Sequence, residues 1–515
     1  MSSGPDMSFV IGRAQPSGGQ QQESGHLFRV LVLGDFSGRA SRKSAQDTAP
    51  IFKPMVVDID SLDKMMQRLD IKLHLQVPQS QGEPVLMALR SLDDFEPDAI
   101  YARMPLFAQL RGLRARLSNP ATFEQAAAEL RASERTAAPV STDAAPTSPV
   151  GAEDDDATLQ RLLGAAPAAP LKAAATGAGQ SMGATVDRLI RSIVAPYVVP
   201  DTAHLQQPMI DALDRAIGEA MRSVLRDPHW RALEGAWRAV DQFVRTVEMD
   251  GQVLLELVDA SAADLLDSLM ESGGDPACMP LARSLQARRL HEGQEEGYAL
   301  VVGLFEFGTS AAEQALLAGL GALAASEGAA FIGSAATPLA LVELPAAWEG
   351  TLPLHPDAAG QARWKAMRAS WVSPHIALVW PQVLARLPYG AKTQIVSSFG
   401  FEEMVGPHQH ENLSWRLAAL DVAALLARAY TDAGWDLLPE SAVELDDMPA
   451  YTDRSGDGPR FQATAELFMS ERQAQAVMAS GVMPLISHRT LPHARLAGWR
   501  SISSQAPALK GRWQA

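Results

Sequence analysis

Apolar residues along this chain follow two periods, and the change between them separates expected strands from expected helices. The run Val30-Leu31-Val32-Leu33 is continuous, whereas Ile71-Lys72-Leu73-His74-Leu75 alternates apolar and polar residues. Continuous runs are typical of strands buried on both faces, and alternation is typical of strands with one buried face. Strands are expected at residues 28–33, 71–77, 85–89, 253–258, 298–307, around 331–333 and at 377–380.

Other stretches repeat at the spacing of a helix face. Leu106, Leu110, Leu113 and Leu117 recur at intervals of three and four, so a single helix is expected over 94–117. Proline cannot continue a helix, so Asp227-Pro228 separates two helices. Helices are further expected at 210–225, from near Trp230 onward, in the stretch beginning at 319, and at 413–430, where apolar residues on most sides predict burial.

Composition divides the chain into parts. Residues 131–185 are dominated by Ala, Pro, Thr, Ser and Gly and would bury too little to offset their ordering entropy, so they are expected to form a linker. The predicted fold class is α/β (α+β). A flexible arm is expected at 1–25, a small α/β domain at 26–130 and a larger mixed α/β domain with an N-terminal helical region at 186–515. The small domain alone would leave apolar surface poorly covered, so we expect the two parts to dock.

The charge of the 515 residues excludes some partners. The chain has 44 Lys and Arg against 60 Asp and Glu, a formal net charge of −16. This charge repels phosphate backbones and anionic lipid, so nucleic acid is not an expected partner. The single cysteine, Cys278, excludes an intrachain disulfide framework and a multi-thiolate metal site.

No segment predicts membrane insertion or export. The most apolar stretch, 311–347, is largely Ala and Gly and is interrupted by Glu327 and Pro338. Residues 1–25 lack the apolar core of a signal peptide. We therefore expect no membrane span and no export by the general route.

Three motifs suggest chemistry, and none completes a site. Gly34-Asp35-Phe36-Ser37-Gly38 lacks the phosphate-loop lysine and the GxSxG spacing, so it predicts a tight turn after a strand. Gly319-Leu320-Gly321-Ala322-Leu323-Ala324 lies in an Ala-rich helical pattern, unlike a dinucleotide site. His408-Gln409-His410-Glu411 offers three ligands, but no further His or Cys completes a zinc site, and a turn before a helix explains it equally well. The sequence predicts no catalytic residue, no cofactor and no metal.

Tryptophans are concentrated in the larger domain, where core packing is their expected role because each ring buries a large apolar area. Trp364 and Trp371 have a spacing that fits one helix face. The tryptophans expected in this core are Trp230, Trp237, Trp364, Trp371, Trp380, Trp415 and Trp435.

A short amphipathic segment interrupts the linker. Leu159, Leu162 and Leu163 lie on one side of a turn or two of helix, and the acidic residues Glu153 to Asp156 before them favour a helix N-terminus. Such a segment in a tether is typical of a docking peptide. A chance cluster of Ala and Leu accounts for the pattern equally well.

Stretches before the linker resemble the small subunit of the type VI secretion contractile sheath, in that family's order and spacing. They are Val30 to Gly38, Val57 to Asp63, and Leu89 to Pro97 together with Leu113 to Leu117. The leucine segment and the residues after the linker resemble the large subunit of the same sheath. The motifs that carry this resemblance are Asp227 to Arg238, Leu384 to Tyr389, Phe399 to Glu403, Thr431 to Trp435 and Gly481 to Leu485.

The chain departs from the sheath pattern in three ways. Both subunits are fused, where the family usually encodes them separately. A large subunit normally continues beyond the position of Ala515 into a part with a C-terminal interlocking strand, so a missing C-terminal part is expected. Pro381-Gln382 stands where the family tends to have Pro-Arg.

The resemblance implies a structural protein, not an enzyme, in the cytoplasm of a Gram-negative bacterium. Its implied partners are other sheath subunits, the inner tube protein and a recycling AAA+ ATPase, which would recognise Leu159, Leu162 and Leu163. Sheath protomers interlock around the tube, and the arm at 1–25 resembles one that adds a strand to an adjoining protomer. The alternative is a sheath-associated protein that caps or regulates assembly without polymerising.

Overall fold

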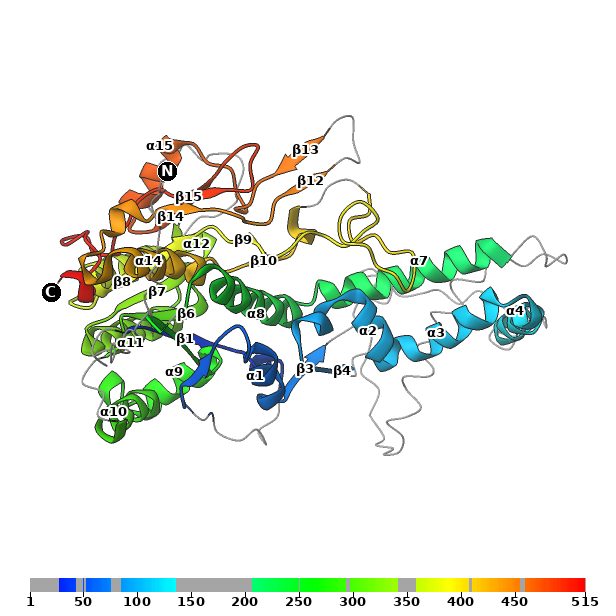
Figure 1. Ribbon diagram of the computed structural model, residues 1–515, viewed down its shortest axis with the longest axis horizontal. Coiled ribbons are helices and arrows are strands. Elements are labelled where there is room, and N and C mark those ends of the chain that lie inside the picture. The colour runs from blue at the N-terminus through cyan, green and yellow to red at the C-terminus, as the bar shows by residue number, and fades with distance from the viewer. Residues whose placement is uncertain are drawn as a thin grey trace, which may run out of the picture.

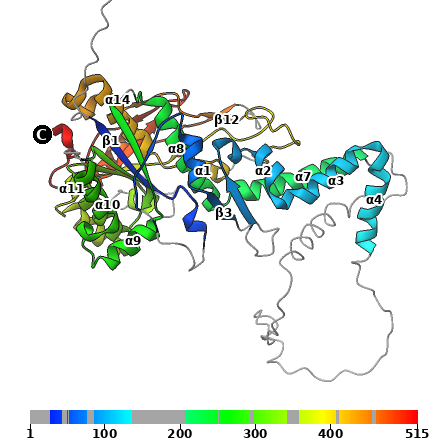
Figure 2. The same ribbon diagram turned by 60° about the horizontal axis from the view of Figure 1, so that its bottom comes forward.

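The structure is a computed structural model that describes residues 27–42, 50, 52–75, 85–135, 206–249, 251–292, 297–340, 358–406, 410–453 and 459–514. A body built on one large sheet carries a helical arm that projects from it (Figures 1 and 2). The arm contains α3 (Pro105–Ser118), α4 (Pro120–Arg135) and α7 (Gln206–Leu225). None of the described helices is both long enough and apolar enough to span a membrane.

The sheet of the body has nine strands in the order β11-β15-β14-β8-β7-β6-β1-β5-β2. The central strands β14, β8, β7, β6, β1 and β5 pair in parallel with one another in that order. The outer pairs β2–β5, β14–β15 and β11–β15 are antiparallel. The strands predicted within this sheet are confirmed, with ends shifted by a few residues. The bounds are β1 Phe28–Gly34, β2 Met55–Val57, β5 Val253–Asp259, β6 Leu300–Phe307, β7 Ala330–Ala335, β8 Ile376–Trp380, β11 Glu444–Leu445, β14 Met483–Ser487 and β15 Ala494–Leu496.

Helices cover both faces of the sheet, which explains the continuous apolar runs in its strands. Val30 and Val32 of β1 point into one core, and Leu31 and Leu33 point into the other. The first core includes α7, α8 (Pro228–Thr246) and α14 (Ala419–Ala433). The second includes α9 (Ala262–Glu271), α10 (Pro280–Glu292), α11 (Ala311–Glu327), α13 (Ala358–Arg368) and α15 (Glu471–Ala479).

A second, two-stranded sheet precedes the helical arm in the sequence, and its strand β3 packs against α8. The predicted strand pair is confirmed as β3 (Ile71–Leu75) and β4 (Val85–Leu89), which are antiparallel, and residues 76 and 77 lie outside the described part. The tight turn after β1 is also confirmed. Gly38 has a φ of 78°, and a Cβ there would lie 3.0 Å from the Lys72 carbonyl oxygen, so only glycine fits. Other short elements are α1 (Leu62–Arg68), α12 (Thr337–Ala340), β12 (Tyr451–Asp453) and β13 (Arg460–Gln462).

The single helix expected over 94–117 is wrong. The chain forms a 3-10 turn, η3 (Leu92–Phe95), then α2 (Pro97–Arg103), then α3. Proline disfavours helical backbone at the residue before it, and Met104 accordingly has an extended ψ of 127° before Pro105. The four leucines used for the prediction do share a buried face, but it belongs to α3 alone.

The helix expected at 413–430 begins later. Trp415 and Arg416 form β10 (Trp415–Arg416), which pairs with β9 (Val383–Leu384), so α14 starts only at Ala419 and continues to Ala433. Its predicted burial is confirmed, because every residue from 419 to 427 is buried.

Most of the expected tryptophans are buried, but Trp371 is 74% exposed. Its predicted alignment with Trp364 is wrong because α13 ends at Arg368, before a second turn could bring Trp371 onto the same face. Trp364 is fully buried, and its Nε1 donates to the Ser480 carbonyl oxygen at 3.1 Å. Trp415 and Trp435 are partly buried.

Candidate assembly interface

The two parts of the chain share the central sheet. β1 pairs along its whole length with β5, from Phe28↔Val253 to Gly34↔Asp259, and on its other side with β6. All seven residues of β1 are buried. β2, which also precedes the helical arm in the sequence, pairs with the edge of β5 that faces away from β1. The expected docking of the two parts is therefore observed as strand insertion.

A partly buried carboxylate holds the turn that follows β1. Asp259, at the end of β5, accepts from the Phe36 and Ser37 backbone N–H groups at 2.8 and 2.9 Å and from Ser37 Oγ at 2.6 Å. Burial raises the pKa of Asp259, and nearby Asp35 raises it further against these hydrogen bonds. The Trp237 Nε1 group of α8 donates to the Phe36 carbonyl oxygen at 2.9 Å. The turn is thus tied to both β5 and α8.

Ion pairs also cross between the two parts. Arg29 of β1 donates to Glu256 of β5 at 2.7 Å, with Glu256 fully buried and also paired with Arg288. Arg39, after the turn, pairs with Asp264 of α9 at 2.9 Å. Buried pairs of this kind contribute little net stability but are costly to break, so they favour one register of the strands.

The base of the arm makes a second set of contacts. The Arg114 guanidinium of α3 binds the Asp214 carboxylate of α7 through two bonds, at 2.6 and 3.0 Å. Asp98 of α2 accepts from the backbone N–H groups of Ser397 and Ser398 at 3.0 and 2.9 Å. These contacts hold the first helices against α7 and against the loop that follows β9.

A buried charge network supports that loop. Arg386 donates to Glu234 of α8 at 2.8 Å and to Glu403 through two bonds, at 2.7 and 3.0 Å. Burial opposes the ionisation of Glu234, but the charges and hydrogen bonds of Arg386 and Arg238 outweigh it and lower the pKa. Burial beside this network raises the pKa of Tyr389 to about 12. The network fixes the loop that presents Ser397 and Ser398 to Asp98.

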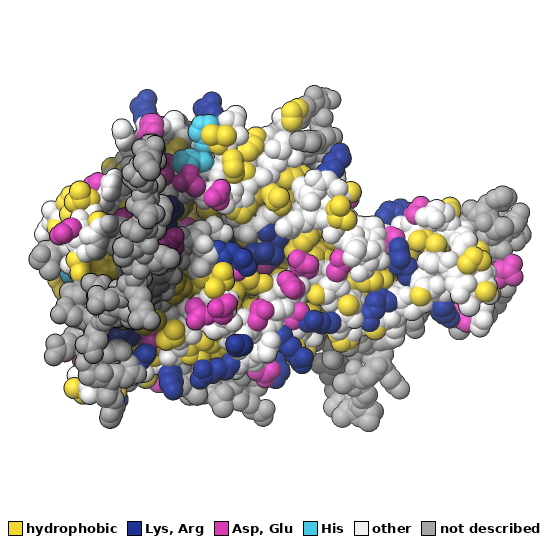
Figure 3. Space-filling view, viewed as in Figure 1, with side chains coloured by type: hydrophobic (Ala, Val, Ile, Leu, Met, Phe, Trp, Pro, Cys, Tyr) yellow, Lys and Arg dark blue, Asp and Glu magenta, His cyan; other side chains and the backbone are white. Residues whose placement is uncertain are grey.

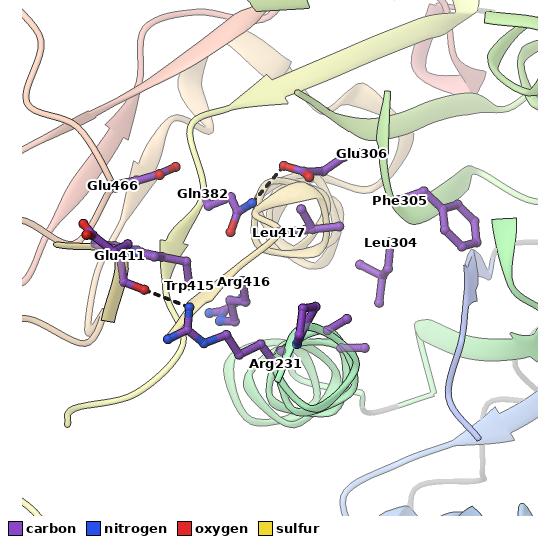
Figure 4. Close-up of a pocket in the computed structure, with 14 residues that line it drawn as sticks. Arg231, Leu304, Phe305, Glu306, Gln382, Glu411, Trp415, Arg416, Leu417 and Glu466 are labelled. Atoms are coloured by element: carbon purple, nitrogen blue, oxygen red, sulfur yellow. Dashed lines mark hydrogen bonds between the residues drawn. The ribbon is translucent and has the colours of Figure 1, made fainter. Parts of the chain in front are cut away.

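A pocket of about 490 Å³ opens between α8, β6 and β10 (Figure 4). Its apolar lining includes Leu304, Phe305 and Leu417. Arg231 lies on one side, and Glu306 lies on the opposite side, where Gln382 Nε2 donates to it at 2.8 Å. Burial and the neighbouring Glu306 raise the pKa of Glu466, which also lines the pocket.

The leucines expected to bind an ATPase, Leu159, Leu162 and Leu163, lie outside the described residues. The expected flexible arm at residues 1–25, His408 and Gln409 also lie outside them. His410 is described. It stacks on Trp415 with ring centroids 4.9 Å apart, and its Nε2 lies 2.6 Å from the Glu466 carbonyl oxygen. Within the described ranges, no group of three His, Cys, Asp or Glu residues is placed to hold a metal ion.

The interface residues Arg29 and Glu256 were not singled out from the sequence. Each is a charged residue inside an otherwise apolar strand run, which is a signal for a buried ion pair. Asp259 and Asp98 carry no comparable signal, because acidic residues at strand ends and first helical turns are common.

Two family models of known proteins match the two parts of the chain separately. Residues 14–133 match the VipA family model of the type VI secretion system. Residues 207–503 match the VipB family model, described as the EvpB tail sheath N-terminal domain. The type VI secretion system sheath protein TssC1 of Pseudomonas aeruginosa is 28% identical over 311 residues, which cover 58% of this chain and 62% of that protein.

The fold and these matches define a structural protein of contractile tails, built from two parts around one sheet. The chain belongs to the type VI secretion tail sheath family and fuses a VipA-like part to a VipB-like part.

Replacing Asp259 tests the contact between the two parts. Asp259→Ala leaves two backbone N–H groups without their acceptor and is expected to destabilise the protein by about 2 kcal/mol. Asp259→Asn keeps an acceptor and removes the buried charge, so it should be at least as stable as the parent near about pH 7. The raised pKa means that the parent loses stability as pH rises from about 4 through that pKa. The advantage of Asp259→Asn should therefore shrink towards about pH 4 in thermal unfolding scans. An asparagine variant as unstable as the alanine variant would contradict this account.

The buried network can be compared with an exposed ion pair on the same helix. Glu234 pairs with Arg238, and Asp241 pairs with Arg245, both at 2.8 Å and both four residues apart on α8. Glu234→Gln should destabilise the protein by about 3 kcal/mol, because the buried Arg386 and the partly buried Arg238 lose a charged partner. Asp241→Asn should change stability by less than about 1 kcal/mol. Equal shifts of the unfolding midpoint in the two variants would show that the buried network stabilises the protein no more than the exposed pair does.

Proposed function

We propose that this chain is a structural component of the type VI secretion tail sheath, located in the bacterial cytoplasm, whose protomers interlock around an inner tube. The observation that carries the proposal is β1, a strand of the VipA-like part that lies between two strands of the VipB-like part. A fused pair with a common sheet is one rigid building block. It would act through the energy of contacts between protomers and needs no chemical step.

The fusion supports this role by raising the effective concentration of one part for the other. The chain resumes after the linker at α7, where Gln206 Nε2 donates to the Leu117 carbonyl oxygen at 2.9 Å. The first described helix after the linker therefore packs against the part of the chain that precedes the linker, and every protomer carries both parts in equal number.

Electron microscopy of the purified chain, alone and mixed with separately encoded sheath subunits, tests the proposal. We expect tubes or tube fragments that contain the chain along their length, because each copy supplies the shared sheet of a protomer. Immunogold label confined to tube ends would favour the alternative of a capping protein. Absence of the chain from all tubes would reject both functions.

We further propose that Leu159, Leu162 and Leu163 bind the recycling AAA+ ATPase. Three leucines on one side of a short helix after an acidic cap have the form of a docking peptide. The segment would be ordered on binding, so its affinity would be modest.

Replacing Leu159 and Leu163 by Asp should abolish capture of that ATPase by the immobilised chain. The unfolding midpoint should stay unchanged, since the sequence predicts that these leucines belong to the linker and not to a core. Replacing Ala165 and Ala166 by Asp in the same linker is the matched control and should leave capture intact. Undiminished capture by the leucine variant would rule out this assignment.

A further inference from the structure

The pocket between α8, β6 and β10 lies where the parallel strands of the large sheet change direction of connection. β5 is the next parallel strand after β1 in the sequence, β7 is the next after β6, and these two lie on opposite sides of the β1–β6 pair. Ligands of open α/β sheets bind outside the carboxyl ends of the strands at such a point. Leu304, Phe305 and Glu306, at the carboxyl end of β6, line the pocket, and a Cβ on Gly34 at the end of β1 would lie 3.4 Å from the Leu304 Cβ. The pocket is therefore where the topology predicts a ligand site.

The two arginines that line the pocket already have partners outside its lining. Arg416 binds the Asp421 carboxylate through both of its terminal nitrogens. Arg231 donates to three backbone carbonyl oxygens at 2.8 to 3.3 Å, and the charges of Glu403 and Glu234 favour its ionised form. Neither arginine makes an ion pair with a carboxylate of the lining in the part of the chain that the structure describes.

Three carboxylates line the same pocket without a cationic partner among the described residues, those of Glu306, Glu411 and Glu466. Gln382 joins two of them, because its Nε2 donates to Glu306 and its carbonyl oxygen accepts from the Glu466 backbone N–H, both at 2.8 Å. Burial raises the pKa of Glu466, and the charge of Glu306 raises it further against the charge of His410. A cation placed between Glu306 and Glu466 would relieve their repulsion.

The pocket differs from the rest of the acidic surface by its apolar wall. On the face shown in Figure 3, Asp and Glu side chains gather near the middle, beside Lys and Arg side chains, so exposed carboxylates alone mark no site. In the pocket, Leu304, Phe305 and Leu417 adjoin the carboxylates and enclose about 490 Å³. This volume lies within the roughly 300–1,000 Å³ of ligand pockets. Within the ranges described, no three acidic or His side chains are placed to hold one metal ion, so an extended organic cation fits the separated carboxylates better.

We propose that the pocket binds an alkyl guanidinium or alkyl ammonium group. The charged head would lie between Glu306 and Glu466, and the aliphatic stem would lie along Leu304, Phe305 and Leu417. An arginine or lysine side chain of a neighbouring protein has this chemistry, and so does a free aliphatic amine. The site itself does not depend on the proposed function. Only the neighbouring protein as the source of the cation rests on it, because there copies of the chain meet in an assembly.

Titration calorimetry of the full chain with agmatine, a butyl chain that carries a guanidinium and an ammonium group, tests the site. Agmatine should bind at least about tenfold more tightly than n-butylurea, a neutral molecule of similar shape, because only agmatine forms charge-assisted bonds. Glu306→Gln and Glu466→Gln should each weaken agmatine binding at least about threefold, and the double variant at least about tenfold. Glu124→Gln, at an exposed glutamate of α4, is the matched control and should bind like the parent.

Glu306→Gln guards against misfolding, because Glu306 is exposed and its unfolding midpoint should stay unchanged. Equal binding of agmatine and n-butylurea, or parent-like affinity of the double variant, would overturn the site.

Sedimentation velocity with and without agmatine then identifies the source of the cation. Weaker self-association in agmatine assigns the cation to a side chain of a second copy, and unchanged association assigns it to a free amine; both results support the site. If tubes form but agmatine does not bind, the site is wrong and the sheath function stands. If agmatine binds but the chain never enters tubes, the site stands and the sheath function fails.

Discussion

β1 lies in the middle of the sheet, and both of its neighbours come from the far side of the linker. Arg29 and its partner Glu256 are 227 residues apart in the sequence. Without β1, the facing edges of β5 and β6 would have unpaired backbone groups, and the apolar side chains on both faces would lose their central row. Open edges of this kind promote aggregation. The two family-related parts therefore form one folding unit, and neither has a complete core alone.

The polar contacts around β1 select its register. A slip by one residue would turn Arg29 away from Glu256 and exchange the side chains of the two cores. Asp259 fixes the position of the strand's end, because its carboxylate accepts only when Phe36 and Ser37 lie beside β5. These groups lose hydration on burial, so their main contribution is to exclude other arrangements of the two parts.

The sequence was most informative where structure depends on neighbouring residues. Runs such as Val30 to Leu33 predicted the buried strands because a strand covered on both faces has no polar side. The prediction of one helix over 94–117 is wrong because Pro97 and Pro105 each begin a new helix, and leucine spacing does not show such breaks. The predicted burial of Trp371 is wrong because α13 ends at Arg368, and the spacing of two tryptophans does not indicate where a helix ends. The strand order, the Asp259 contact and the pocket depend on segments that are far apart in the sequence. The spacing of apolar residues within one segment does not indicate which other segment it contacts.

The way β1 completes the sheet also limits how copies can join. The remaining edges of the large sheet are β2 with three residues and β11 with two, and Val56 of β2 is exposed. Edges this short offer few backbone groups and resist uncontrolled pairing. Strand addition between copies at these two edges would therefore form few backbone hydrogen bonds.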